Sequence, residues 1–127
     1  MSRAALLHAS HCGRPVEVGV ATDAEVAALQ APVSVKARDM LERWTLIAIR
    51  NVSFNGVELH ALGWRRGLQN SWITSALTIV DLPARLVATR SGNAYGLAEA
   101  DVEGLSPELA EHLAYALSMW GFSDVRV

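Results

Sequence analysis

Side chains of the kinds that zinc prefers gather near the N-terminus of the chain. His8, His11 and Cys12 lie close together in the sequence. A structural zinc site needs a second pair of ligands at a suitable spacing, and the sequence offers none. We therefore expect neither a metal nor a cofactor, and we expect this segment to form a frayed turn.

A hydrolytic site would need a nucleophile, a base and an orienting group within hydrogen-bond reach. Ser75, His60 and Asp81 could supply these groups if their strands pair. The sequence contains no nucleophile elbow, no phosphate-binding glycine loop and no HExxH pattern. We therefore expect a protein that is not an enzyme.

Tryptophan and arginine are concentrated in the middle of the chain, around a polar segment predicted to be a loop over residues 63–71. Such residues anchor protein interfaces, and they also stack on bases and pair with phosphates. Alternatively, the tryptophans fold back onto the sheet and the arginines are solvated. The candidate binding residues are Trp64, Arg65, Arg66, Trp72, Arg85 and Arg90.

Charge is unevenly distributed along a chain whose net charge is -2. Residues 43–90 hold six basic and two acidic side chains, whereas residues 91–127 hold six acidic side chains and one basic one. The middle is too weakly basic to indicate nucleic-acid binding by itself. Glu108 and Glu111 could form an acidic binding face on a C-terminal helix, and we count them among the candidate site residues.

Two turns divide residues 73–97 into three alternating segments, which predicts a β-meander. Residues 73–80 form the first segment, residues 85–90 the second, and Tyr95 and Leu97 close the third. Pro83 marks the first turn, and Gly92 can take the positive φ that the second requires.

Residues 44–52 are apolar at both odd and even positions, which predicts a central strand covered on both faces. Asn55-Gly56 then predicts a tight hairpin to a strand over residues 57–62. Earlier in the chain, the alternating valines of residues 15–21 predict a short edge strand.

Capping patterns predict the helices. Thr22 with Glu25 forms a capping box for a helix over residues 23–30, and Ser34 is expected to cap a second short helix over residues 35–43. Near the C-terminus, Ser106 precedes a helix with Pro107 at its first position. Its apolar stripe ends at Gly121, which suits the residue after a helix. The stripe comprises Leu109, Leu113, Ala116, Leu117 and Trp120.

The totals indicate one α+β domain over residues 1–127. We expect an antiparallel sheet of about five strands, made of the meander and the Asn-Gly hairpin. It should pack with a C-terminal helix and one or two short N-terminal helices. No apolar run approaches the length of a membrane span, and the single cysteine is typical of a cytoplasmic protein. An open sheet edge or exposed aromatic side chains would also allow a homodimer.

The middle of the chain resembles small, mostly uncharacterised proteins of bacterial plasmids and phages. The resemblance covers Ala61–Leu62, Ile73–Ser75, Asp81 and Thr89–Leu97, an "ITS…D…TRSG…Y.L" meander. Anti-CRISPR inhibitors are a recurring class among such proteins, and the resemblance implies a protein that occludes a surface of a host defence complex. Many inhibitors of that class are strongly acidic, and the net charge of -2 departs from this.

We therefore expect a non-enzymatic protein-binding module from a mobile element, possessing either the Trp-Arg loop or the acidic helix face as its contact surface. The alternative is a small nucleic-acid-binding regulator that uses the basic sheet region.

Overall fold

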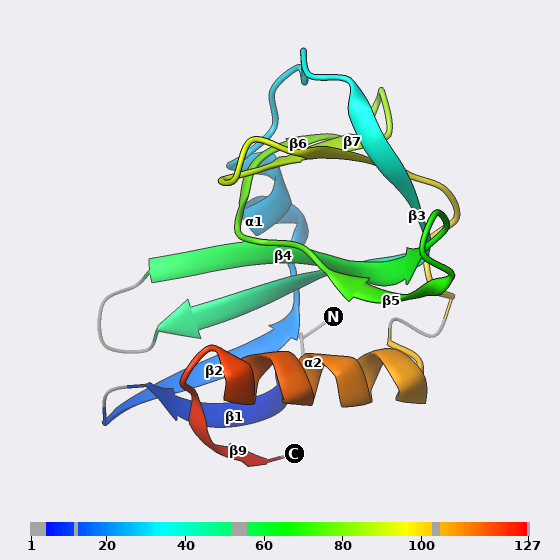
Figure 1. Ribbon diagram of the computed structural model, residues 1–127. Helices are drawn as coiled ribbons and strands as arrows, with labels where there is room; N and C mark the ends of the chain where they lie inside the picture. Colours follow the sequence, from blue (N-terminus) through cyan, green and yellow to red (C-terminus); the bar gives the residue numbers. More distant parts are fainter. Residues whose placement is uncertain (1–4, 12, 52–55, 103–104, 127) are drawn as a thin grey trace.

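The computed structural model describes residues 5–11, 13–51, 56–102 and 105–126. Within these residues the chain is an α+β fold in which two helices accompany a curled, mixed sheet of nine strands (Figure 1). The elements are β1 (Ala5–His11), β2 (Arg14–Val20), α1 (Asp23–Ala27), β3 (Ala37–Asn51), β4 (Gly56–Arg65), β5 (Asn70–Ile73), β6 (Leu77–Asp81), β7 (Leu86–Thr89), β8 (Ala94–Leu97), α2 (Pro107–Met119) and β9 (Ser123–Arg126).

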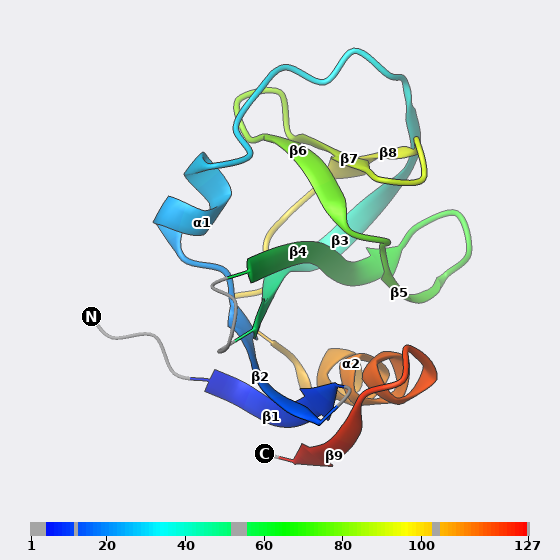
Figure 2. The same cartoon turned by 90° about the vertical axis from the view of Figure 1, so that its left-hand side faces the viewer.

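The sheet is organised around β3, which pairs with three other strands. It is antiparallel to β2 and β4 and parallel to β8, the one parallel strand pair among the described strands. β4 pairs along one edge of β3, and the other edge is shared: β8, followed by β7 and β6, pairs with the first residues of β3, and β2, followed by β1 and β9, pairs with its last residues. Figures 1 and 2 show the meander arching over β3 and β4, with β1, β2, β9 and α2 below.

Two hydrophobic cores lie on opposite faces of β3 and β4. Ile47 and Ile49 pack against β1, β2 and α2, whereas Leu46 and Ala48 pack against β6, β7 and β8. The prediction of a central strand covered on both faces is thereby confirmed. Burial of a leucine or isoleucine side chain contributes about 2 kcal/mol to the free energy of folding. Because the side chains of β3 alternate between the two faces, β3 contributes to the stability of both cores.

A bulge bends β3 at Arg43 and Trp44, where its register against β4 shifts. Arg43 has a φ of 48°, a left-handed conformation that costs a non-glycine residue about 1 kcal/mol or more. Gly63 faces the bulge, and a Cβ there would lie 3.0 Å from a β3 carbonyl oxygen. At the bulge, the Trp44 backbone N–H donates to the Glu99 carbonyl (3.2 Å), and the Trp44 carbonyl accepts from the Asp101 N–H (2.9 Å).

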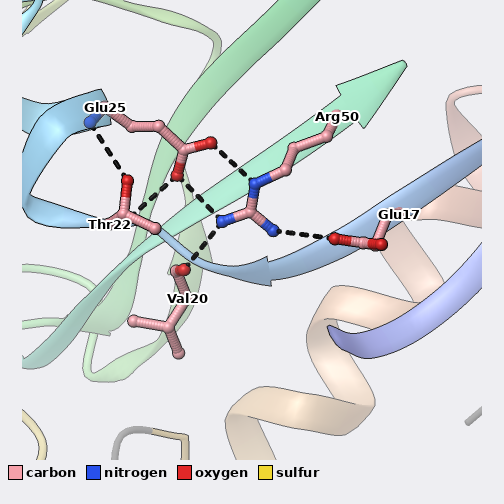
Figure 3. A network of polar contacts seen from close by, with 5 residues as sticks. All are labelled: Glu17, Val20, Thr22, Glu25 and Arg50. Carbon is pink, nitrogen blue, oxygen red and sulfur yellow. Dashed lines mark hydrogen bonds and ion pairs between the residues drawn. The ribbon is translucent and has the colours of Figure 1, made fainter. Parts of the chain in front are cut away.

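Helix α1 is held by a buried ion pair. The Thr22–Glu25 capping box is present, as predicted, and the Glu25 carboxylate also accepts two bonds from Arg50, at 2.6 and 2.8 Å (Figure 3). Arg50 further donates to the Val20 carbonyl and lies 3.5 Å from the Glu17 carboxylate. No side chain of α1 is fully buried, so this network and the partly buried Val26 together hold the helix on the sheet.

Helix α2 confirms the predicted C-terminal helix. Ser106 occupies the N-cap, although its hydroxyl makes no capping bond. At the other end Gly121 has a φ of 89°, and its N–H donates to the Ser118 carbonyl while the Phe122 N–H donates to that of Leu117. This pair of bonds is a Schellman motif, which satisfies carbonyls that the helix would otherwise leave unpaired.

The predicted helix over residues 35–43 is wrong. Strand β3 already begins at Ala37, and its first residues pair in parallel with Ala94 to Leu97 of β8. Pairing with a distant strand overrides the local capping pattern at Ser34. One short N-terminal helix remains, and it ends at Ala27 rather than at residue 30.

The expected strand count and pairing also need correction. The described sheet has nine strands rather than about five, and it is mixed rather than wholly antiparallel. The N-terminal segment is not a frayed turn, because β1 pairs with both β2 and β9. The strand predicted over residues 15–21 exists as β2, but it lies between β1 and β3 and not at an edge.

The meander is confirmed with altered bounds, and of the predicted hairpin the pairing of its two strands is confirmed. The turns at Pro83 and Gly92 connect β6, β7 and β8 as predicted. The first predicted segment is divided, however, since Ile73 ends β5 and β6 begins at Leu77. Strand β3 pairs with β4 as predicted, but Gly56 already belongs to β4 and lies opposite Asn51, so the predicted two-residue turn at Asn55-Gly56 is wrong. Asn55 itself lies outside the described residues.

Replacement of Glu25 by glutamine should make the protein less stable and its stability less sensitive to acid. The hydrogen bond from Arg50 lowers the pKa of Glu25 from 4.5 to about 2. Since the folded-state pKa is the lower one, this stabilisation is complete above pH 4.5 and is lost as the pH falls through about 2. Glu25→Gln should lower the free energy of unfolding at neutral pH by about 3 kcal/mol, measured by denaturant titration at several pH values.

Asp23→Asn is the matched control, because Asp23 is an exposed carboxylate in the same helical turn. It should change the free energy of unfolding by less than about 0.5 kcal/mol. Equal losses in the two variants would contradict the assigned role of the ion pair.

Candidate functional site

The end of β4 holds Arg65 inside the fold. Arg65 is buried, donates to the Asp39 carboxylate at 2.8 Å, and lies 4.4 Å from the Trp72 ring and 5.6 Å from the Tyr95 ring. Burial opposes ionisation of Asp39, but hydrogen bonds from Arg65 and from two backbone N–H groups outweigh it and lower the pKa of Asp39. Arg65 and Trp72 are therefore parts of a structural cluster.

The predicted loop over residues 63–71 is shorter than expected, because β4 continues to Arg65 and β5 begins at Asn70. Trp64 is half-buried, with the Arg43 guanidinium 5.7 Å from its ring. Arg66 is exposed and donates to the Glu42 carboxylate at 2.8 Å. Among the predicted residues of this loop, Arg66 is the exposed one.

The remaining candidate arginines also donate within the chain. Arg85 has a φ of 59°. Its Nε donates to the Leu97 carbonyl at 2.9 Å, and its Nη2 donates to the Ala98 carbonyl. Arg90 donates to the Glu58 carboxylate at 3.2 Å. The four arginines of the nucleic-acid alternative therefore all have internal acceptors, and this geometry gives that alternative little support.

A polar groove of about 720 Å³ lies between β4 and the C-terminal end of α2. Its polar and aromatic lining combines residues that are far apart in the sequence, and one of them, Arg90, is a predicted binding residue. The lining includes His11, Glu58, His60, Arg90, Trp120 and Phe122.

His60 is the buried polar residue at the centre of this groove. Its Nδ1 lies 2.9 Å from the Thr74 carbonyl oxygen and its Nε2 lies 2.9 Å from the Glu58 carboxylate. Both neighbours are acceptors, so both bonds form together only when each ring nitrogen carries a proton. The Trp120 ring stacks on the imidazole at a centroid distance of 4.8 Å, which links β4 to the end of α2.

Glu58 lies between two donors, His60 and Arg90. The hydrogen bond from His60, with the charges of both neighbours, lowers the pKa of Glu58 to about 2. A carboxyl group with so low a pKa is a weak proton acceptor at neutral pH. The groove therefore holds charged groups that can orient a bound partner. In the free protein these groups are hydrogen-bonded to one another, His60 and Arg90 each to Glu58.

Of the three residues considered for hydrolysis, Ser75 and His60 both line the polar groove and Asp81 does not, and no hydrogen bond joins any two of them. The Ser75 hydroxyl pairs with that of Ser91 at 3.0 Å. Asp81 accepts from the N–H groups of Val33 (3.1 Å) and Ala84 (3.3 Å), and His60 is bonded elsewhere.

The outer face of α2 exposes large apolar side chains beside the predicted acidic pair. Tyr115 is 66% exposed and Met119 is 67% exposed. Glu108 and Glu111 are exposed as well, and their spacing from Tyr115 and Met119 places all four on one side of the helix. Trp120, 38% exposed, connects this face with the polar groove. We call Glu108, Glu111, Tyr115, Met119 and Trp120 the α2 face.

The structure does not gather the candidate metal ligands of the N-terminal segment into a metal site within the described residues. His8 is exposed on β1, and the His11 ring lies 4.8 Å from that of Phe122. Cys12 lies outside the described residues. Across the described ranges, no group of three or more histidine, cysteine or acidic side chains is placed to hold a metal ion.

Comparison with protein-family models, with curated proteins and with solved structures found no significant match. In the described part of the chain, neither helix is long and apolar enough to cross a membrane.

Two features of these sites were missed from the sequence. Asp39 and Tyr95 complete the Arg65 cluster from distant strands, and no local pattern links them to the loop. Tyr115 and Met119, by contrast, could have been found. They are four residues apart and lie opposite the buried leucines of α2, so helical periodicity already predicts an exposed apolar pair.

Adjacent arginines should respond very differently to substitution. Arg65→Ala removes a buried guanidinium that pairs with the half-buried Asp39 and packs on Trp72, and it should lower the free energy of unfolding by about 3 kcal/mol. Arg66→Ala removes an exposed ion pair and should lower it by less than about 1 kcal/mol. Thermal and denaturant unfolding measure both, and similar values for the two variants would overturn the structural role of Arg65.

Proposed function

We propose that this chain is a non-enzymatic protein-binding module that contacts its partner through the α2 face. The observation that carries the proposal is the exposure of Tyr115 and Met119 on α2, with Trp120 partly exposed at its C-cap. Large aromatic and methionine side chains are enriched at protein interfaces, where a few of them supply most of the binding free energy. The helix is anchored from below by Leu109, Leu113 and Leu117, so its outer face is presented rigidly.

The charge of the α2 face indicates the chemistry of the partner. Glu108 and Glu111 lie toward the N-terminal end of α2, and the apolar side chains lie toward its C-terminal end. Arg43 approaches Glu108 only to 3.9 Å, with both side chains largely exposed, so this contact is weak. A surface with basic residues next to an apolar patch would complement both ends of the face.

The polar groove adjoins the apolar end of the α2 face through Trp120. Its charged residues, Arg90 and Glu58, could accept polar groups at the rim of an interface. The narrower expectation, an inhibitor from a mobile element that blocks a host defence complex in the cytoplasm, would use the same surface and stays a prediction.

Removal of the apolar pair should abolish partner binding without unfolding the chain. We expect Tyr115→Ser/Met119→Ser to reduce capture of a bacterial host protein by at least about tenfold, since two interface anchors contribute more than about 1.4 kcal/mol together. Affinity capture with quantitative mass spectrometry, followed by cross-linking to α2, measures this. Because both side chains are exposed, thermal stability should be retained.

The matched control is Val35→Ser/Leu68→Ser, which removes two exposed apolar side chains elsewhere on the surface. It should retain capture. Loss of capture in the control alone, or equal capture by all three proteins, would refute the assignment of the interface to α2. A wild-type dimer that the Tyr115/Met119 variant dissociates would instead identify a second copy of the chain as the partner.

A further inference from the structure

A second cavity, of about 510 Å³, lies between α1 and the bend of β3. It shares no lining residue with the polar groove. Residues from five separate segments meet around it: the end of β2, helix α1 with the residues after it, the bulge of β3, the turn between β6 and β7, and the segment that follows β8. It is thus a product of the tertiary fold, built beneath a helix that the Arg50–Glu25 pair attaches to the sheet.

The walls of this cavity are mostly apolar. Trp44 and Leu46 lie in β3, Val26 and Ala27 lie in α1, and Leu82 lies in the turn between β6 and β7. The Trp44 ring is fixed, because its Nε1 donates to the Ala98 carbonyl at 3.1 Å. The cavity therefore has one rigid aromatic side chain and several aliphatic ones.

Several of these apolar groups are incompletely covered by the protein itself. Val20 is 36% exposed and Leu82 is 40% exposed, and α1 has no buried residue. Apolar surface of this kind gains free energy from any apolar molecule that displaces water from it. Because α1 is attached by its capping box and by Arg50, its position does not depend on filling the space beneath it.

The polar groups of the lining decide the charge of the molecule that fits. Asp23 and Asp101 are carboxylates, whereas Gln30 and Thr45 are neutral. Among the described residues that line the cavity there is no lysine, arginine or histidine. An anion would meet two negative charges and no cation, which is unfavourable in a partly apolar site.

We infer that this cavity is a binding site for an uncharged, mainly apolar small molecule. Its volume lies within the range of about 300–1,000 Å³ that is typical of ligand sites in proteins, and its few polar groups among apolar walls are also typical. The site is independent of the α2 face, so the chain would bind a small molecule and a protein at separate places.

Two probes with the same ring skeleton test the inference. N-phenyl-1-naphthylamine is uncharged, and 8-anilino-1-naphthalenesulfonate adds a sulfonate to it. Titrated into the full chain, the uncharged probe should show saturable fluorescence at one molecule per chain. The sulfonate should bind at least about tenfold more weakly, because of Asp23 and Asp101.

Ala27, the last residue of α1, and Ala28, its C-cap, provide matched variants. Ala27 lines the cavity, so Ala27→Phe should fill it and raise the Kd of the uncharged probe at least about tenfold. Ala28 is equally exposed but does not line it, so Ala28→Phe should leave the Kd within about twofold. Ala100→Leu approaches from the opposite wall and should also weaken binding.

Absence of saturable binding by the uncharged probe would overturn the inference. So would an equal Kd for Ala27→Phe and Ala28→Phe, or tighter binding of the sulfonate than of the uncharged probe. Should Ala27→Phe fail to fold, the comparison of Ala100→Leu with Ala28→Phe decides the question in the same way.

Discussion

The fold depends on one constraint, that β3 belongs to two hydrophobic cores at once. Its even and odd side chains after the bulge point into opposite cores, and its first residues pair with β8 while its last pair with β2. The bulge at Arg43 redirects the strand between these two sets of partners. A single strand thereby joins the meander above to β1, β2 and α2 below (Figure 1).

The internal use of charge follows from this arrangement. Arg50 of β3 and Arg65 of β4 are buried, and each is paired with a carboxylate from another element, Glu25 of α1 and Asp39 of β3 respectively. A buried cation needs such a partner, because its transfer from water is otherwise costly. Exposed apolar side chains remain on α2 and around the cavity under α1. This distribution supports recognition through shape and apolar contact more than through basic charge.

The sequence predicted what is determined locally. The Thr22–Glu25 capping box, Gly121 after α2 and the two-faced apolar run of β3 depend on neighbours within a few residues, and all are present. It did not predict the start of β3, because the pairing that makes Ala37–Leu41 a strand comes from β8, far along the chain. The Arg65 cluster was missed for the same reason, whereas the exposed Tyr115–Met119 pair follows from helical periodicity.

The central claim is that β3 couples the two cores into one cooperative unit. Hydrogen exchange of its backbone amides, followed residue by residue by NMR, tests this most directly. The account predicts similar opening free energies for protected amides of Ala37–Leu41 and of Ile47–Asn51, close to the global free energy of unfolding. Exchange of the first group orders of magnitude faster than the second would show two cores that open separately, and would contradict it.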